Sequence, residues 1–509
     1  MGLYDYSIYS IIKRNARIYK NRPAFICNGS SLTHLEFKEK ADQLANGLRG
    51  IGVEKGDRIG IIAQNSLEYM YLYGAAAKIG AVMLPVNWRL KPEEIEYVVK
   101  DCAPKIVFAD SDFQELTALL AAKFDFIEKI YAMEKAVGEF VAFDDLMIDT
   151  KSADSAAKVE SDVKADEAYV IIHTAAVAGN PRGATLSHQN LVVANLQSIY
   201  IWQLNEKDCN LCMLPLFHVA GLGLALNIMH AGGLNVILPK FDPEAALKHI
   251  QEDKVSIFFE FPPMLSTLLE KNQELKYDIS SVKTLGGMEH PDTVKQYEKI
   301  TGGTFWTAFG QSETAGFVTF APFNEKPGSA GKPSPMAEVK IVDPHGNFLP
   351  PGKAGEIVVR GPLVFMGYWN LPEDNDHTFR NGWHHTGDMG RFDDDGYLFY
   401  VARMPEKELI KPGGENVYPA EVEKAILEHP MLEEVSVIGI RDKKWGEAIK
   451  AVCKLKDGAS LTKADLIEFV ASKIARFKKP KEVVFVDQLP KTEDGEIDRL
   501  KVKADYGDK

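Results

Sequence analysis

Cysteine is scarce in this chain, and no long apolar run is uninterrupted. Its 509 residues include five cysteines, of which Cys209 and Cys212 form a C-x-x-C pair. Neither a second cysteine pair nor a histidine pair completes a zinc-binding set, which argues against a metal or redox centre there. The most apolar stretch, residues 210–239, contains proline, histidine and asparagine. It therefore predicts a buried helix and strand rather than a membrane span.

Basic charge and targeting signals are also lacking. The formal net charge of −13 argues against a general nucleic-acid-binding protein, although a local basic patch could still hold a nucleotide. Residues 1–16 show no positively charged start followed by an apolar core, so no secretory signal is expected. Tyr6 stands where a myristoylation site needs serine or threonine. We therefore expect a cytoplasmic protein.

Length and texture predict two domains and an α/β fold. A chain of 509 residues is too long for one ordinary hydrophobic core. Up to about residue 327, near-continuous apolar runs alternate with helical patterns, which is typical of parallel strands covered by helices on both faces. Short strands with Gly and Asp turns then indicate a small β-rich subdomain over about 327–403. We assign residues 1–403 to a large N-terminal domain and residues 404–509 to a small α+β domain.

A loop of small residues separates an apolar run from a helical pattern. Residues 174–183 follow the strand-like run 168–172 and precede a helix predicted from about Ser187 to Ala194. A strand, a small-residue loop and a helix start commonly hold phosphate, because backbone N–H groups and the helix dipole face the anion. It is not a Walker A loop, because no Gly-Lys-Ser/Thr follows at the required spacing.

Position by position, this loop resembles the phosphate loop T-S-G-T-T-G-x-P-K-G of the adenylate-forming acyl-CoA synthetases. Four residues match it: Thr174, Gly179, Pro181 and Gly183. Residues 175–178, Ala-Ala-Val-Ala, replace its Ser, Gly, Thr and Thr, and Arg182 replaces its lysine. Most hydroxyl donors are therefore absent. We expect backbone N–H groups, Thr174 and Arg182 to hold the pyrophosphate.

The resemblance extends over nearly the whole chain. Residues 215–221, PLFHVAG, resemble a motif whose histidine, here His218, sits near the acyl pocket. Residues 286–288, GGM, resemble the loop between adenine and the acyl group. Residues 309–313, FGQSE, resemble Y-G-x-T-E, with Phe309 as the adenine-stacking ring and Glu313 as the magnesium-associated carboxylate. Magnesium takes oxygen ligands beside phosphates, which suits Glu313.

Three further motifs lie in the C-terminal third. Residues 386–388, TGD, resemble the motif whose aspartate accepts both ribose hydroxyls, as a carboxylate can, and Arg403 matches the ribose-contacting arginine. Residues 407–423 resemble the family's hinge and core signature, in which Lys411 serves the thioester-forming pose. A basic run follows, in which we expect either a solvated face or a contact for the phosphates of coenzyme A: Lys473, Arg476, Lys478, Lys479 and Lys481.

The resemblance implies an AMP-forming ligase that uses ATP, Mg²⁺ and coenzyme A. The acid first forms an acyl-adenylate with release of pyrophosphate; the small domain then rotates, and the thiol of coenzyme A displaces AMP. The implied catalytic residues are Lys411, His218, Glu313 and Arg182, with Glu313 also binding the metal. The implied cofactor-binding residues are Thr174, Gly179, Gly183, Gly287, Met288, Phe309, Gly310, Ser312, Asp388, Arg403, Gly413 and Gly414.

The acid itself is less defined. Four apolar residues are candidates for its pocket: Phe217, Phe258, Met264 and Ala308. They favour a hydrophobic carboxylic acid without choosing between linear, alicyclic and aromatic chains. Three other functions stay open: a synthetase working mainly toward ATP, a non-catalytic acyl-adenylate or acyl-CoA binding protein, and a luciferase-type oxidase. A homodimer is included among the expected assemblies.

The last motif departs most from the family. Residues 489–499 resemble L-P-K-T-x-x-G-K-I-x-R, whose second lysine reaches the adenylation site, but Glu496 stands there. Two unit charges about 4 Å apart interact by roughly 4 kcal/mol at an effective dielectric near 20, so a carboxylate against a phosphate is costly. We expect Glu496 to stay out of the adenylation site, with Lys491 and Arg182 supplying part of the missing charge.

Reversal of this charge predicts unequal half-reactions. Supplied with preformed acyl-AMP, the protein is expected to make acyl-CoA readily, whereas acyl-AMP formation from acid and ATP is expected to be slower. Single-turnover assays of both steps, on the parent and on Glu496→Lys, test this. Fast adenylation in the parent that becomes slower in Glu496→Lys would contradict it.

Overall fold

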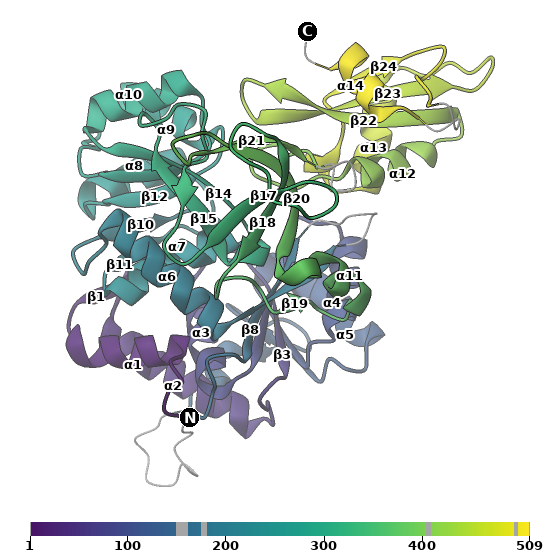
Figure 1. Ribbon diagram of the computed structural model, residues 1–509. Helices are drawn as coiled ribbons and strands as arrows, with labels where there is room; N and C mark the ends of the chain where they lie inside the picture. The colour runs from purple at the N-terminus through teal and green to yellow at the C-terminus, as the bar shows by residue number, and fades with distance from the viewer. Residues whose placement is uncertain (1, 149–160, 175–180, 404–408, 493–496, 508–509) are drawn as a thin grey trace.

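The computed structural model describes residues 2–148, 161–174, 181–403, 409–492 and 497–507. Gly179 and Glu496, to which the sequence assigns roles, lie outside the described residues. The described part is an α/β structure in which large mixed sheets carry helices and a small sheet domain follows at the C-terminus (Figure 1). The predicted fold class is confirmed.

The first large sheet has the strand order β19-β9-β8-β4-β3-β5-β6-β7, and all its strands from β8 onward in that order run parallel. Its bounds are β3 (Arg58–Ile62), β4 (Val82–Pro85), β5 (Ile106–Ala109), β6 (Lys129–Ala132), β7 (Val141–Ala142), β8 (Ala168–Thr174), β9 (Arg182–Ser187) and β19 (Gly367–Tyr368). Strand β4 ends in Pro85, yet it pairs with both β3 and β8. A strand here tolerates proline because the ring removes a single donor at the end of the pairing.

The second large sheet has the order β16-β15-β14-β13-β12-β10-β11-β1-β2. Its bounds are β1 (Pro23–Cys27), β2 (Ser30–Thr33), β10 (Cys209–Cys212), β11 (Leu234–Ile237), β12 (Ile257–Glu260), β13 (Thr284–Gly287), β14 (Thr304–Gln311), β15 (Gly316–Pro322) and β16 (Lys332–Pro333). Its central strands are parallel, and β2, β15 and β16 are antiparallel additions at the two edges.

Helices cover both sheets, which explains the apolar character of the strands. One core joins the two sheets through α1 (Ile8–Ile18), α2 (His34–Gly50), α3 (Leu67–Ile79), α6 (His188–Trp202) and α7 (Val219–Ala231). The far face of the first sheet packs against α4 (Pro92–Cys102) and α5 (Gln114–Lys123). The far face of the second packs against α8 (Pro243–Glu252), α9 (Met264–Leu275) and α10 (Pro291–Thr301). Parallel strands buried on both faces need apolar side chains throughout.

The β-rich subdomain forms a four-stranded antiparallel sheet in the order β17-β18-β20-β21. Its bounds are β17 (Glu338–Val342), β18 (Gly355–Arg360), β20 (His384–Phe392) and β21 (Leu398–Arg403), with α11 (Pro372–Thr378) beside β20. Two short strands of the same stretch, β16 and β19, instead extend the edges of the two large sheets. The subdomain is therefore tied into both sheets.

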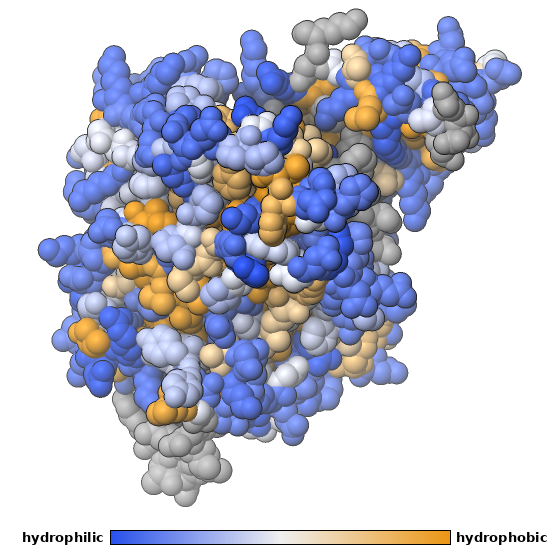
Figure 2. Space-filling model, viewed as in Figure 1, coloured by the Kyte–Doolittle hydropathy of each residue, from blue (hydrophilic) through white to orange (hydrophobic). Residues whose placement is uncertain are grey.

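The small domain has a three-stranded sheet in the order β22-β23-β24 and lies at one end of the molecule (Figure 1). Its bounds are β22 (Leu432–Asp442), β23 (Gly446–Leu455), β24 (Glu482–Phe485), α12 (Pro419–Leu427), α13 (Lys463–Lys473), α14 (Arg499–Tyr506) and the short helix η6 (Arg476–Lys478). On the face shown in Figure 2, its surface is largely hydrophilic.

The expected strand–loop–helix at the phosphate loop is wrong in one respect. Residues 182–187 form strand β9, which pairs antiparallel with β8, Thr174 lying opposite Arg182. Helix α6 begins only at His188, where the Ser187 side chain accepts from the Asn190 N–H. The loop therefore joins two strands of a hairpin, and the N-terminus of α6 does not follow it directly.

The described cysteines are free thiols, and each of the five is buried. The C-x-x-C pair lies on β10 without a disulfide. No helix among the described residues is long and apolar enough to cross a membrane.

Candidate active site

The residues singled out by the sequence gather at the ends of strands. Thr174 ends β8, Gly287 ends β13 and Gln311 ends β14, which leads into the short helix η3 (Ser312–Thr314). Asp388 and Arg403 lie on β20 and β21 of the adjoining subdomain. Carboxyl ends of parallel strands are the usual place for a ligand in an α/β sheet.

Asp388 and Arg403 face each other across two antiparallel strands. They are register partners, and Arg403 Nε donates to Asp388 Oδ1 at 3.2 Å. The Gln311 amide donates to Oδ2, and the Tyr400 hydroxyl lies 3.4 Å from Oδ1. The carboxylate is thus buried and held in one orientation. Each oxygen has further acceptor capacity, which leaves Asp388 able to accept a pair of hydroxyls.

A second group connects Arg182 to Glu313 through Tyr368. The Tyr368 hydroxyl donates to Glu313 Oε1 at 2.8 Å, and the Arg182 guanidinium lies 4.0 Å from the centre of the Tyr368 ring. Arg182 also lies 3.6 Å from Asp374. Its Nε is buried and has no hydrogen-bond partner among the described residues. An unpaired buried donor is costly, so this group suits an anion such as a phosphate.

Lys411 reaches this site from the small domain. Burial and the nearby Arg403 lower the pKa of Lys411 to about 8. Three carboxylates act on it in the opposite direction: Asp388, Glu447 and Glu313. The Arg403 guanidinium also donates to the Leu409 carbonyl at 2.7 Å, which ties the Asp388–Arg403 pair to the segment that carries Lys411. The site is therefore built from both domains.

His218, the N-cap residue of α7, lies at a second contact between the domains. Its Nε2 is 3.6 Å from Glu415 Oε2, an ion-pair distance too long for a hydrogen bond. The Arg89 guanidinium pairs with the other oxygen of Glu415. Burial would raise the pKa of Glu415, but His218 and Arg89 outweigh it and hold that pKa at about 2. Glu415 is therefore a buried anion that joins the small domain to the large one.

Two glycines beside Glu415 make this contact possible. Gly413 and Gly414 have φ angles of +59° and +83°. A Cβ on Gly414 would lie 2.7 Å from Cγ of Phe261, and one on Gly413 would lie 2.7 Å from the Trp445 ring. Any larger residue would strain the backbone and push the segment away from the N-terminal domain. Their predicted role in cofactor binding stays a prediction.

The other nucleotide-binding candidates are placed at the same edge. Gly287 has a φ of +153°, and a Cβ there would lie 2.2 Å from the Glu260 carbonyl oxygen. Met288 beside it is 49% exposed, whereas Phe309 is 8% exposed and packs in the core of the β-rich subdomain. Stacking of Phe309 on adenine therefore stays a prediction. It requires part of the Phe309 ring to be accessible at the edge of this core.

The remaining candidates line up with the strand ends. Gly310 lies against β15, where a Cβ would lie 2.1 Å from the Gly316 carbonyl oxygen. Ser312 begins η3 and is partly exposed next to Glu313. The Thr174 hydroxyl lies 3.4 Å from the Arg182 carbonyl oxygen, and a Cβ on Gly183 would meet Ile171 at 2.6 Å.

Sequence reasoning missed some residues of the site. Tyr368 lies outside the motifs considered, and only the pairing of β19 with β9 brings it to Arg182. Gln311 and Glu415 stood inside those motifs without an assigned role. Phe258 was placed at the acyl pocket, but it packs against α8 and α9 in the core on the far side of β12. Its neighbour Phe259 faces the other way, because successive strand residues alternate between the two faces.

This arrangement defines a class of two-domain α/β proteins whose site is shared between the domains. The chain belongs to the adenylate-forming acyl-CoA synthetase family: residues 12–369 match the family model of the AMP-binding enzyme, and residues 421–496 match that of the AMP-binding enzyme C-terminal domain. The resemblance stated from the sequence is confirmed.

Relatives and solved structures agree with this family. The chain is 34% identical over 500 residues to a feruloyl-CoA synthase of Amycolatopsis sp, covering 97% of this chain and 98% of that protein. It is 32% identical to an indoleacetate–CoA ligase of Aromatoleum aromaticum, covering 96% and 95%. A crystal structure described as a putative long-chain-fatty-acid CoA ligase from Rhodopseudomonas palustris is 44% identical, with a TM-score of 0.75 and coverage of 79% and 100%.

The Asp388 geometry predicts a specific loss of nucleotide affinity. Asp388→Asn keeps the volume but removes the charge and one acceptor oxygen, so AMP and ATP are expected to bind about tenfold or more weakly, since a charged hydrogen bond contributes about 1.5–3 kcal/mol. Isothermal titration measures this. Tyr400→Phe is the matched control, because it removes only the 3.4 Å contact and is expected to change affinity little. Unchanged affinity in Asp388→Asn would remove Asp388 from the ribose site.

The lowered pKa of Lys411 predicts a pH dependence. The cationic form is present below about pH 8 and is lost as the pH rises through that value. If the cation serves thioester formation, kcat/KM for acyl-AMP, which reports the free enzyme, falls above pH 8 in the parent relative to Lys411→Arg. The ratio is expected to change about tenfold between pH 7 and 9. Coenzyme A ionises alike in both proteins, so parallel profiles would contradict the assignment.

Proposed function

We propose that this protein joins a compact hydrophobic carboxylic acid to coenzyme A through an acyl-adenylate, with conversion of ATP to AMP and pyrophosphate. The observation that carries the proposal is the convergence of Asp388 with Arg403, Arg182 with Glu313, and Lys411 at one edge of the sheets. This set supplies a carboxylate that can accept hydrogen bonds from ribose hydroxyls and an arginine that can donate hydrogen bonds to phosphate. It also supplies a carboxylate suited to a metal and a cation from the small domain.

The first half-reaction forms the mixed anhydride. A carboxylate oxygen of the acid attacks the α-phosphorus, and the bond from that phosphorus to pyrophosphate breaks. Arg182, whose Nε has no hydrogen-bond partner in the described part of the chain, would hold the phosphates. Glu313 would be the carboxylate for Mg²⁺, which neutralises charge on the departing pyrophosphate when bound. The Tyr368 hydroxyl orients Glu313 for that role.

The second half-reaction transfers the acyl group. The sulfur of coenzyme A attacks the acyl carbonyl carbon, the thiol proton leaves, and the bond from that carbon to the AMP oxygen breaks. AMP departs as an anion, and Lys411 stands among the residues that would hold it. His218 lies beside Glu415 at the domain contact. We propose that the thiol enters the site next to this histidine.

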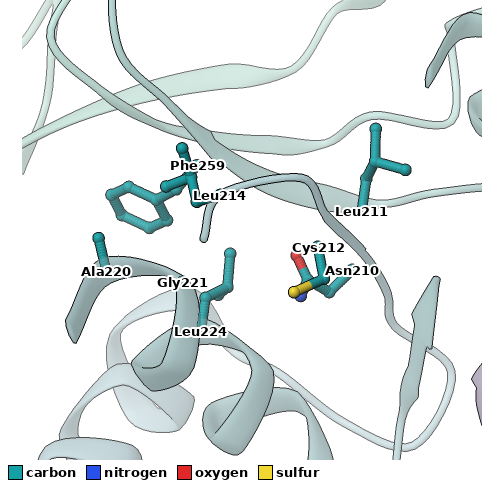
Figure 3. Close-up of a pocket in the computed structure, with 8 residues that line it drawn as sticks. All are labelled: Asn210, Leu211, Cys212, Leu214, Ala220, Gly221, Leu224 and Phe259. Carbon is teal, nitrogen blue, oxygen red and sulfur yellow. The ribbon is translucent and has the colours of Figure 1, made fainter. Parts of the chain in front are cut away.

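The proposed acyl pocket lies around the N-terminal end of α7 (Figure 3), whose N-cap residue is His218. Ala220, Gly221 and Leu224 of α7 face Phe259 and Leu214 there, around a cavity of about 10 Å³. A cavity of that size holds roughly one water molecule. The lining combines apolar side chains with the polar Asn210, as expected for a hydrophobic acid held beside a few polar groups.

Large aromatic rings close the pocket from behind. Phe259 stacks on Phe317 with ring centres 5.0 Å apart, and Trp202 contacts both Phe259 and Phe320 at 5.3 Å. A long alkyl chain would have to displace several of these buried rings, whereas a compact acid needs only small side-chain shifts. This packing supports a compact acid. The five free thiols suit a reducing compartment, which supports the proposed cytoplasmic location.

A panel of acids tests the function. Hexanoate, cyclohexanecarboxylate, benzoate and palmitate are offered with ATP, Mg²⁺ and coenzyme A, and AMP, pyrophosphate and loss of thiol are measured. We expect equimolar AMP and pyrophosphate, with palmitate at least tenfold slower in kcat/KM than the best compact acid. The same panel as acyl-CoA with AMP and pyrophosphate tests net ATP formation. Absence of turnover in both directions would contradict the proposal and leave the binding-protein and luciferase-type alternatives.

Pocket variants test the location of the acid. Leu224→Ala enlarges the proposed pocket and is expected to shift the preference toward bulkier acids. Leu247→Ala is the matched control, because Leu247 is equally buried but lies in the core on the far side of the second sheet. An equal shift in both variants would move the acyl pocket elsewhere.

A further inference from the structure

Lys478 is a buried cation at the boundary between the two domains. Lys478 is 3% exposed. Its Nζ lies 2.6 Å from Glu421 Oε1 and also contacts Glu94 Oε1. Glu94 belongs to the N-terminal domain and Glu421 to the small domain. The expectation that the basic run is either a solvated face or a coenzyme A contact is therefore wrong for Lys478. Lys479 beside it is partly exposed and pairs with Glu468 of its own domain.

The contact involves the first turn of α4 and three elements of the small domain. Glu94 is in that first turn, where it also accepts from the Lys91 N–H in a capping box. The Lys91 ammonium donates to the carbonyl of Ala471 in α13 at 3.0 Å. Glu421 is in the first turn of α12, and Lys478 ends η6. One turn of α4 thus touches α12, α13 and η6.

Burial of these charges makes the contact sensitive to orientation. A lysine withdrawn from water is strongly destabilising unless carboxylates compensate it, and here each domain supplies one. Burial and the neighbouring Glu94 raise the pKa of Glu421 to about 7, whereas Lys478 lowers that of Glu94 in spite of its burial. Any other orientation of the small domain separates Lys478 from Glu94.

The same strip of the N-terminal domain grips the segment that carries Lys411. Asn87 and Arg89 contact Glu415, and Glu94 contacts Lys478, so residues 87–94 hold the small domain at two points. Lys411 and Glu421 are on one continuous stretch that ends in α12. Fixing the first turn of α12 against α4 therefore also fixes where residues 409–418 lie.

We propose that residues 87–94 together with Lys478 form a latch that holds the small domain in the orientation with Lys411 in the active site. On the proposed function, Lys478 is then a positioning residue for the coenzyme A step, not for formation of the acyl-adenylate. It touches neither substrate nor reacting atoms and acts through Lys411.

Cross-linking tests the latch without relying on catalysis. Cysteines are introduced as Lys91→Cys and Ser472→Cys, next to the observed contact of Lys91 with Ala471, and are joined with a short bis-maleimide; the native cysteines are buried. Lys478→Met is expected to slow cross-linking at least fivefold. Lys454→Met is the control, because Lys454 pairs with Glu433 inside the small domain. Unchanged cross-linking in Lys478→Met would overturn the proposal.

Half-reaction kinetics give the second readout. Lys478→Met is expected to slow single-turnover acyl transfer from acyl-AMP to coenzyme A about tenfold and to leave acyl-AMP formation within twofold. Equal losses in both steps would overturn the positioning role. The charge-swapped pair Glu94→Lys with Lys478→Glu, made together with Glu421→Gln so that the new carboxylate does not face Glu421, is expected to restore fast cross-linking if the latch acts between residues 94 and 478. No rescue, in a variant with parental thermal unfolding, would contradict that. If no acid is turned over, the proposed function fails while cross-linking still decides the latch.

Discussion

The contact of Glu415 with Arg89 and His218 is the interaction on which the site depends. A carboxylate buried between two domains is stable only where partners compensate it, and both partners, the Arg89 guanidinium and the His218 ring, come from the N-terminal domain. The segment 409–418 is thereby brought to Asp388 on β20 and to Glu313 in η3, just after the end of β14. The pKa of Glu415, near 2, shows that it stays ionised throughout the physiological range. The domain contact is therefore not lost by titration of this carboxylate near neutral pH.

Close packing of glycine at this contact has a direct chemical consequence. Gly413 and Gly414 allow Trp445 and Phe261 to approach their backbone. The segment therefore lies near enough to Arg403 for this arginine to lower the pKa of Lys411. Burial beside another cation lowers the pKa of Lys411, because both effects disfavour its charged form. A bound anion such as AMP or an acyl-adenylate would stabilise that charged form. The charge balance of the site thus favours a bound phosphate when the two domains meet in this way.

Much of the architecture could be predicted from sequence, because periodicity and capping are local. Helix α3 (Leu67–Ile79) is an example, because Ser66 caps its start and Gly80 ends it in a left-handed conformation. Motifs likewise bring Asp388, Arg403 and Glu313 to one site, although their roles there stay predictions. The error at β9 arose because a hairpin and a strand–helix turn begin alike. The error at Phe258 was a shift of one residue, which reverses the face of a strand.

Other features could not be read from any local pattern. Lys478 looks like one more member of a basic run until Glu94, 384 residues away in sequence, is placed beside it. Tyr368 reaches Glu313 only through an edge strand of two residues. Such contacts depend on tertiary pairing across the whole chain, and composition carries no signal for them.

The pKa of Lys411 directly tests whether the two domains form one shared site, because its low value depends on groups of both domains. Competitive acetylation of the full chain over a pH series, with peptides quantified by mass spectrometry, measures it without turnover. We expect Lys411 to titrate near pH 8, and its pKa to be higher when AMP is bound. Titration near 10.4, as for an ordinary exposed lysine, with no response to AMP would contradict it.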